Sequence, residues 1–186
     1  DTKNVTMMSN MFTSCDGLTE LDLSSFDTTK VTDMSYMFRN CSSLETIYVS
    51  EEWTTEGVDK SNSIDMFIDC TKLKGASGTG YDVAHIDNEY ARIDTAETPG
   101  YLTGIDKLPD SLKTSLSGAV ISAVANQTYT GSPIAPAVSV SLNGKTLAAK
   151  DYTLSYANNK DVGAATITAT GQGRYKDQAS TTFQIV

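Results

Sequence analysis

The chain has 186 residues, of which 39% are apolar and 20% charged, so it can bury a core in one large or two small domains. Its net charge of −9 repels phosphate backbones, which argues against nucleic-acid binding. No run of about 18 apolar residues is present, so we expect no membrane insertion within this chain.

The charge is unevenly distributed between two parts of the chain. Residues 1–104 hold 7 basic and 18 acidic residues, whereas residues 105–186 hold 7 basic and 5 acidic residues. The apolar pattern also changes, from a long repeat to short β-rich runs. We therefore predict a repeat domain over 1–104, a linker over 105–117 and a second domain over 118–186.

One motif recurs three times in the first part. VTMMSNMFTSCDGL (5–18) and VTDMSYMFRNCSSL (31–44) start 26 residues apart and share eight of fourteen positions, and KSNSIDMFIDCTKL (60–73) is a weaker copy. A period of this length is typical of proteins built from stacked repeats. We predict repeats over about 1–26, 27–52 and 53–75, followed by a cap over 76–104.

Each repeat is expected to combine a short helix with a short strand. In the second copy, apolar residues fall on one helical face, at Val31, Met34, Met37, Phe38 and Cys41. Period-two alternation then follows in 18–23 and 44–49, which predicts strands that stack into one parallel sheet. The methionines suit the narrow interior between successive units because their unbranched side chains fill irregular gaps.

The three cysteines occupy one position of the repeat, which favours free thiols in the core. A disulfide between neighbouring copies is the alternative, and no second Cys or His lies at the spacing of a metal site. The predicted core residues are the sulfur-containing and aromatic residues of the three copies: Met8, Met11, Phe12, Cys15, Met34, Met37, Phe38, Cys41, Met66, Phe67 and Cys70.

The segment LTELDLSSFDTTKVTDMSYMFRNCSSL (18–44) resembles the 26-residue repeat of BspA-type bacterial surface proteins, and 75–103 resembles the segment that closes such arrays. The resemblance implies an α/β leucine-rich-repeat-like solenoid with a strand and a short helix per repeat, and a role in attachment to surfaces. We also expect the chain to be a fragment of a longer array. Its exposed apolar end, around Met8, Met11 and Phe12, suggests end-to-end self-association.

From about residue 118 the sequence changes to short β-rich runs separated by turn signals. Asn143-Gly144 predicts a tight hairpin, and Asn158-Asn159 a second turn. Five or more short strands in such a length favour a small β-sandwich. The segment beginning YTGSPIAPAVSVSLNGKTL resembles a bacterial immunoglobulin-like module, which implies an all-β spacer.

Few residues suggest chemistry. His85 is the only histidine, so any Ser–His or Cys–His nucleophile would need it. We interpret it as a cap residue bonded to nearby carboxylates or backbone; a catalytic dyad, or a divalent cation held by Asp82, Asp87 and Asp94, are the alternatives. GASGTG (75–80) lacks the lysine and helix of a phosphate loop. We therefore predict no catalytic residue, no metal site and no cofactor.

The outward side chains of the predicted sheet are the best candidates for ligand contact. If the leucines of the first strand point inward, Glu20 and Asp22 face solvent, and Tyr48 follows at the equivalent position of the next strand. We predict a ligand-binding surface of Glu20, Asp22, Tyr48 and Trp53, with an ordinary solvated face as the alternative. Trp53 has a second interpretation, as a larger core residue.

These expectations indicate a non-enzymatic protein of the bacterial cell surface or cell wall. The repeats would bind proteins or glycans of a host or neighbouring cell, and the second domain would present them. The alternative is a purely structural stalk whose binding is carried by repeats absent from this chain.

Overall fold

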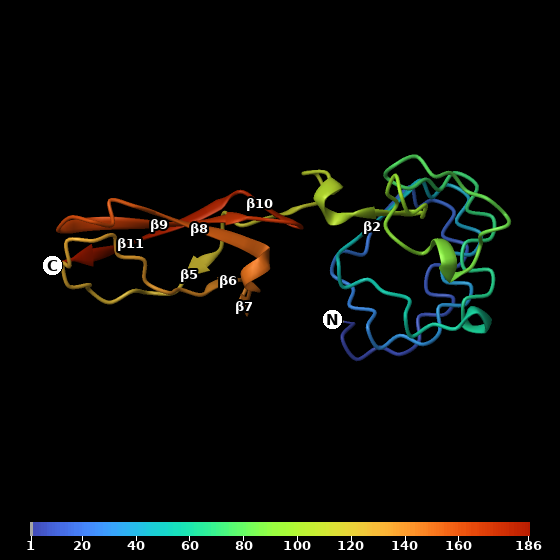
Figure 1. The fold of residues 1–186 in the computed structure, drawn as a ribbon, viewed down its shortest axis with the longest axis horizontal. Helices are drawn as coiled ribbons and strands as arrows, with labels where there is room; N and C mark the ends of the chain where they lie inside the picture. The colour runs from blue at the N-terminus through green and yellow to red at the C-terminus, as the bar shows by residue number, and fades with distance from the viewer. Residues whose placement is uncertain (1) are drawn as a thin grey trace. The chain divides into compact units, whose positions relative to one another are not determined.

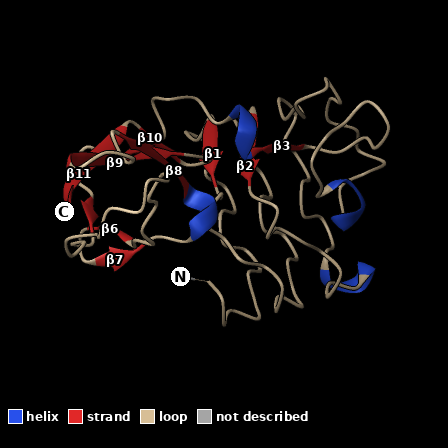
Figure 2. Cartoon of the chain, turned by 60° about the vertical axis from the view of Figure 1, so that its left-hand side comes forward, coloured by secondary structure: helices blue, strands red, loops and turns tan. Residues whose placement is uncertain are grey.

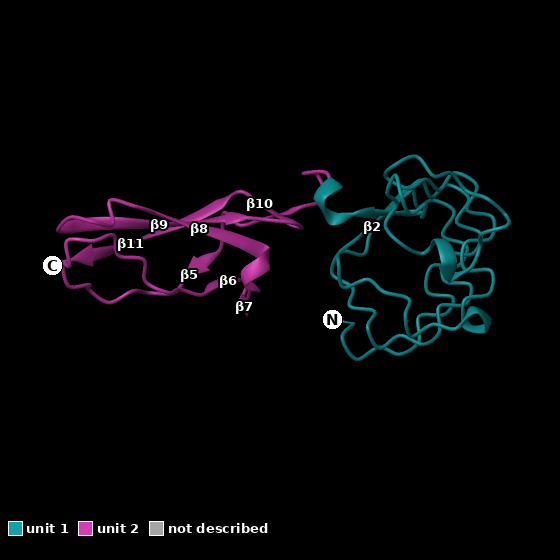
Figure 3. Ribbon diagram, in the orientation of Figure 1, with its two compact units in different colours: residues 1–108 teal, residues 109–186 magenta. Residues whose placement is uncertain are grey.

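The structure is a computed structural model that describes residues 2–186. It divides into two compact units, residues 1–108 and 109–186 (Figure 3). The division falls inside the predicted linker 105–117, whose first four residues belong to the first unit. Among the described residues, no helical segment has both the length and the apolar character needed to span a bilayer.

The first unit contains one small parallel sheet. Its strands are β1 (Glu20–Asp22), β2 (Thr46–Val49) and β3 (Leu102–Gly104), in the order β1-β2-β3. Glu20 pairs with Thr46 and Asp22 with Tyr48, which is the 26-residue offset of the repeat. The parallel pairing of β1 and β2 agrees with the sequence, and Figure 2 shows the three strands side by side.

The predicted fold class, an α/β solenoid with a helix in each repeat, is wrong. Within residues 2–186 no α-helix is present, and helical structure is limited to four three-residue 3₁₀ segments: η1 (Lys60–Asn62), η2 (Asn88–Tyr90), η3 (Ile105–Lys107) and η4 (Ala149–Asp151). The chain is built from strands and turns, and most of the first unit is drawn as loop in Figure 2. The fold is therefore all-β in character.

Left-handed residues explain why the repeats do not form helices. Equivalent positions of the copies have positive φ, at Asn10 and Ser14, Tyr36 and Asn40, and Asp65 and Asp69, with values between 52° and 62°. One such residue interrupts a right-handed helix, because a side chain at positive φ cannot continue the helical path. The apolar residues are therefore separated by successive turns: Met37 N–H bonds to Met34 O, and Cys41 N–H to Phe38 O.

In the first two copies, alternate backbone N–H groups of the turn segment bond to the next repeat. In the second copy, the N–H groups of Met34, Tyr36, Phe38 and Asn40 donate to carbonyls of Asn62, Ile64, Met66 and Ile68 at 2.8–2.9 Å. Four backbone N–H groups of this segment are therefore satisfied by the neighbouring repeat, which an isolated repeat could not do.

Equivalent side chains of successive repeats stack in columns. Phe38 lies between Phe12 and Phe67, with ring centroids 5.6 and 5.3 Å away and nearly parallel planes. Cys41 Sγ donates to Phe12 O and Cys70 Sγ to Phe38 O, each at 3.0 Å, and all three cysteines are free thiols.

Eight of the predicted core residues are at most 2% exposed: Met8, Met34, Met37, Phe38, Cys41, Met66, Phe67 and Cys70. Phe12 and Cys15 are only partly buried, and Met11 is 47% exposed. The prediction of a buried Met11 is thus wrong. Met37, at the equivalent position of the second copy, is fully buried.

The segment after the third copy closes this core. Phe67 N–H donates to Ile86 O, and the ring of Tyr101, which is fully buried, meets Phe67 edge-on at 5.3 Å. Trp53 is 9% exposed and donates its indole N–H to Ala91 O at 2.9 Å. Trp53 is therefore a large core residue, as the second interpretation of the sequence proposed.

The second unit contains two three-stranded antiparallel sheets and one short parallel pair. One sheet has the order β11-β9-β8, from β8 (Tyr152–Ala157), β9 (Gly163–Gly171) and β11 (Gln178–Ile185) (Figure 1). The other joins β5 (Val120–Ile121), β6 (Val140–Leu142) and β7 (Lys145–Thr146). The short pair is β4 (Thr114–Ser115) with β10 (Tyr175–Lys176).

Side chains from both antiparallel sheets form one core in this unit. It includes Ile121 and Val140 from one sheet and Ile167 and Phe183 from the other. The predicted Asn143-Gly144 turn joins β6 to β7 with φ values of 51° and 79°, as a tight hairpin turn requires.

Candidate functional site

A groove opens beside the parallel sheet of the first unit. It has a volume of about 590 Å³, and its lining includes Thr46 and Tyr48 of β2, Thr103 of β3, Lys107 and the 74–78 loop. This size lies in the range of sites that hold small ligands, about 300–1,000 Å³. The groove is therefore the candidate site of this unit.

Strand register places two lining residues of the groove side by side. Asp22, Tyr48 and Thr103 are neighbours across β1, β2 and β3, so their side chains belong to one face of the sheet, and Tyr48 and Thr103 line the groove. Tyr48 is 7% exposed, and its hydroxyl donates to Glu20 Oε1 at 3.4 Å. Burial, and then the neighbouring Glu20 carboxylate, raises the pKa of Tyr48. The phenol therefore stays protonated at neutral pH.

The 74–80 loop forms one wall and is held by a buried carboxylate. Asp94, which is 3% exposed, accepts hydrogen bonds from Ser77 N–H at 2.7 Å, Thr79 N–H at 3.1 Å, Thr79 Oγ1 at 2.6 Å and Gly100 N–H at 3.2 Å. Gly75 is required here, because a Cβ would collide with Gly100 O and the Asp94 side chain.

These hydrogen bonds determine the charge state of Asp94. Burial alone would raise its pKa, but the donors from Thr79, Ser77 and Gly100 together outweigh burial and hold the pKa below its ordinary value of 3.8. Asp94 is therefore ionised at neutral pH, and its oxygens are used by the loop. Its role in the groove is to position the wall.

Two exposed lysines give the groove a cationic rim. Lys74 begins the loop, and its backbone N–H donates to Glu45 O. Lys107 lies in η3, and its ammonium group is 3.4 Å from Asp106 Oδ2. Together with the hydroxyls of Thr46 and Thr103, these groups offer hydrogen-bond donors to a ligand rich in oxygen, and the Tyr48 oxygen, whose proton is donated to Glu20, can accept one. The lining contains no histidine or cysteine.

Of the four predicted ligand-binding residues, only Tyr48 lines the groove. Glu20 and Asp22 are exposed on β1 beside Tyr48, although Asp22 Oδ1 also accepts Ser24 N–H at 2.9 Å and so holds the turn after β1. Trp53 is not part of this groove. It lines a different, smaller pocket of about 360 Å³ that also includes Arg92.

Sequence reasoning missed the lysines and Thr103. Their contribution depends on β3 pairing with β2, at Tyr48↔Thr103, and this pairing joins segments more than fifty residues apart. The segment YLTG (101–104) does not by itself identify the strand with which it pairs.

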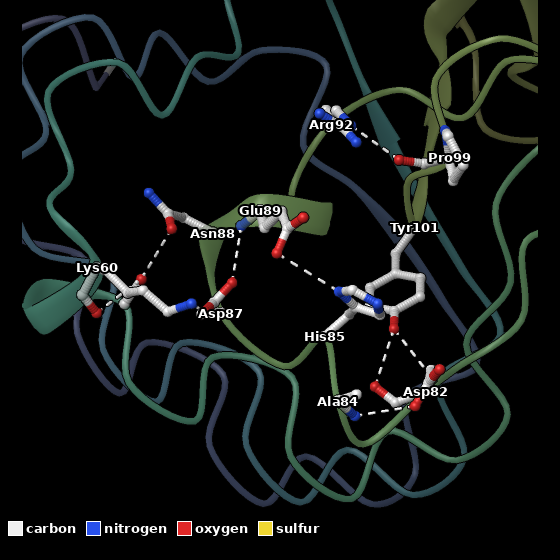
Figure 4. Close-up of polar contacts among 11 residues, drawn as sticks. Lys60, Asp82, Ala84, His85, Asp87, Asn88, Glu89, Arg92, Pro99 and Tyr101 are labelled. Carbon is white, nitrogen blue, oxygen red and sulfur yellow. Dashed lines mark hydrogen bonds and ion pairs between the residues drawn. The ribbon is translucent and has the colours of Figure 1, made fainter.

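The only histidine lies in the closing segment, in a network drawn in Figure 4. His85 stacks on Tyr90 with centroids 4.1 Å apart, and its Nδ1 lies 3.5 Å from Glu89 Oε2. Asp82 Oδ1 accepts Ala84 N–H, and Asp87 forms an ion pair with Lys60 at 3.0 Å. The Asp87–Lys60 pair joins this segment to η1, but His85 Nδ1 is buried without a hydrogen-bond partner among the described residues, so the predicted bond of His85 to a carboxylate or backbone group is not confirmed.

Neither alternative interpretation of this histidine finds support in its contacts. Asp94 is engaged at the groove wall, and Asp87 accepts Glu89 N–H in addition to the ion pair with Lys60. In the part of the chain that the structure describes, no three His, Cys, Asp or Glu side chains are grouped to hold a metal ion.

Comparison with known proteins adds a family but no activity. No curated protein matches the chain, and no solved structure matches it. The family described as "Mycoplasma protein of unknown function, DUF285" matches residues 1–99. Because this match covers more than half of the 186 residues, the chain belongs to that family.

Proposed function

We propose that the chain is a non-enzymatic part of a bacterial cell-surface protein, and that its first unit binds a surface protein or glycan through the groove on the β1-β2-β3 sheet. The second unit serves as a spacer that presents the first. The observation that carries this proposal is the groove itself, with the hydroxyls of Thr46 and Thr103 and the ammonium groups of Lys74 and Lys107 beside Tyr48.

The lining of the groove favours a glycan. Threonine and tyrosine hydroxyls match the hydroxyl groups of a sugar, and Lys74 and Lys107 suit a carboxylate or sulfate substituent. The size of the groove suits a short oligosaccharide. A stable protein–protein interface would instead need a broad apolar patch of about 800 Å² on each partner.

The surface location rests on the resemblance of residues 18–44 to repeats of BspA-type surface proteins. The spacer role rests on the resemblance of the second unit to immunoglobulin-like modules. A binding role for the first unit is consistent with the absence of histidine and cysteine from the groove lining, since these residues commonly serve as bases and nucleophiles in catalysis.

The test is binding of the 186-residue chain to an array of neutral and acidic glycans. We expect retention of acidic glycans and a loss of at least tenfold in the double variant Lys74→Ala/Lys107→Ala. The matched control is Lys72→Ala/Lys160→Ala, which removes the same charge from exposed positions outside the groove lining. Equal binding by both double variants would refute the groove as the site, and binding only to proteins would exclude a glycan.

A further inference from the structure

The first unit contains a second, smaller hollow of about 360 Å³ that Trp53 lines, which we call the tryptophan pocket. One wall comes from the segment 50–56, after β2, and the other from residues 91–93 of the closing segment. The motif copies that begin at Val31 and Lys60 are 29 residues apart, whereas β1 and β2 pair at an offset of 26. The three extra residues therefore fall between β2 and Lys60, and the pocket forms where the repeat is interrupted.

The inner surface of the tryptophan pocket is apolar. Trp53 donates its indole N–H to Ala91 O at 2.9 Å, so the surface that it offers a ligand is the carbon surface of the ring. Ala91 is buried, and Ile93 is 36% exposed. The charged residues of the lining are exposed at its rim: Glu51, Glu56 and Arg92. The interior therefore favours a small apolar group.

Two hydroxyl groups add hydrogen-bond donors to this apolar lining. Ser50 Oγ accepts Glu52 N–H at 3.3 Å, and Thr54 Oγ1 accepts Glu56 N–H at 3.2 Å. Among the described residues 2–186, no acceptor receives the proton of either hydroxyl. Because a hydroxyl carries one donor as well as its lone pairs, each can still donate to a ligand. An apolar wall beside such donors suits a group that combines a methyl with a carbonyl oxygen.

The tryptophan pocket adjoins the groove on two strands. On β2, Tyr48 lines the groove, and Ser50, which lines the pocket, follows it by two residues, at most about 7 Å along the chain. On β3, Thr103 lines the groove, and a Cβ on the next residue, Gly104, would lie 3.7 Å from side-chain atoms of Ile93 in the pocket wall. One ligand can therefore reach both hollows.

We propose that the groove and the tryptophan pocket are adjacent subsites for an acidic glycan that carries an N-acetylated sugar; this rests on the proposed binding of a glycan in the groove. The carboxylate of the glycan lies beside Lys74 and Lys107. The acetyl methyl packs against Trp53 and Ile93, and the acetyl oxygen accepts the Ser50 hydroxyl proton. The lysines select for charge, and the pocket selects among acidic glycans.

The test compares two tetrasaccharides of equal charge and identical linkages. One alternates glucuronate with N-acetylglucosamine, and the other alternates glucuronate with glucose, so they differ only in the acetamido group. Calorimetric titration of the 186-residue chain should show about tenfold tighter binding of the N-acetylated one, because one buried methyl is worth about that factor. Trp53 is the only tryptophan, so its emission should change with the N-acetylated tetrasaccharide and stay constant with the other.

Variants separate the two subsites. Ile93→Ser removes an apolar wall of the pocket and should lower the affinity for the N-acetylated tetrasaccharide to that for the other, which should not change. Ile93→Thr keeps the branched shape and should act in the same direction, so the test does not depend on one variant folding. The matched control is Val83→Ser, an exposed apolar position outside both linings, which should leave both affinities unchanged. Lys74→Ala/Lys107→Ala should weaken both.

The outcomes distinguish this inference from the function on which it rests. Equal affinity for the two tetrasaccharides, still dependent on Lys74 and Lys107, would overturn the pocket as a subsite and leave glycan binding by the groove intact. A preference for the N-acetylated tetrasaccharide that both Ile93 variants retain would also overturn it. No binding of either tetrasaccharide by the unaltered chain would refute acidic-glycan binding by the groove itself.

Discussion

The two units of the molecule bury their cores by different rules. In the first, strands of only three or four residues alternate with turns, and side chains stack on their equivalents in the neighbouring repeat. In the second, β9 and β11 have nine and eight residues, and buried positions such as Ala165, Ile167 and Ala169 alternate with less buried ones along a strand.

This difference concerns where the partner of a buried residue lies. In the first unit, the partner is 26 or 29 residues away at the same position of the repeat, as Phe38 is to Phe12 and Phe67. In the second unit, burial is set by the face of the strand. Substitutions should therefore act through position in the stack in one unit and through strand face in the other.

The largest effect is expected at the centre of the phenylalanine column. Phe38→Ala removes a fully buried ring that contacts two others, and should lower the free energy of unfolding by about 3–5 kcal/mol. Phe12→Ala, at the half-buried end of the column, should cost about half as much. Urea unfolding followed by Trp53 fluorescence measures both, because the only tryptophan lies in this core. Equal losses would contradict the dependence on position in the stack.

The columns also mark what the sequence could and could not predict. Repetition of Met, Phe and Cys identified the buried residues of the second and third copies, and alternation identified β1 and β2. The spacing of Val31, Met34, Met37 and Phe38 fits a helix as well as it fits successive turns. The distinguishing signal is the recurrence of residues that tolerate positive φ, such as Asn10, and it is weak because Tyr36 occupies the equivalent position.

The groove was predicted only in part for a related reason. Alternation in β1 and β2 placed Glu20, Asp22 and Tyr48 on one face, and of these only Tyr48 lines the groove. Its wall and rim depend on the closing segment folding back, so that Asp94 holds the 74–80 loop. Such long-range contacts leave no periodic signal in the sequence.

The second largest effect is expected at Asp94. Asp94→Asn replaces an acceptor of four hydrogen bonds by an amide whose NH₂ faces some of the same donors, so it should cost about 2–3 kcal/mol at pH 7. Asp94 lies outside the repeated motif. Comparing the loss of stability in Asp94→Asn with that in Phe38→Ala therefore tests whether the closing segment stabilises the first unit as strongly as stacking does.

Asp94 also predicts a dependence on pH. Its pKa in the folded chain is below the ordinary value of 3.8, so the unfolded chain binds more protons between those two values. The stabilisation is present above about pH 4 and is lost as pH falls through the lower, folded pKa. Thermal unfolding between pH 7 and pH 2.5 should show a smaller acid-induced loss for Asp94→Asn than for the unaltered chain. Parallel pH profiles would contradict this assignment.

A smaller effect is expected in the second unit, where the face of the strand on which a residue lies determines its burial. Ile167→Val removes one methylene from a fully buried position of β9 and should cost about 1 kcal/mol. Thr166→Ala, on the neighbouring, less buried position, should cost less than half of that. Hydrogen exchange of β9 amides measures the stability of this sheet. A larger loss for Thr166→Ala would show that burial does not alternate there.

The smallest effect on stability, and the one most informative about function, is expected for Tyr48→Phe. The hydroxyl donates to Glu20 at 3.4 Å, a long bond to an exposed carboxylate, so its loss should change the free energy of unfolding by less than about 1 kcal/mol. The ring stays in place and the stack is untouched. Ligand binding should nevertheless fall several-fold, because the groove loses the phenolic oxygen as a hydrogen-bond acceptor and Glu20 is released from its contact. Calorimetric titration with a retained glycan, beside thermal unfolding of the same variant, separates the two effects. A loss of stability without a loss of binding would mean that Tyr48 supports the sheet and takes no part in recognition.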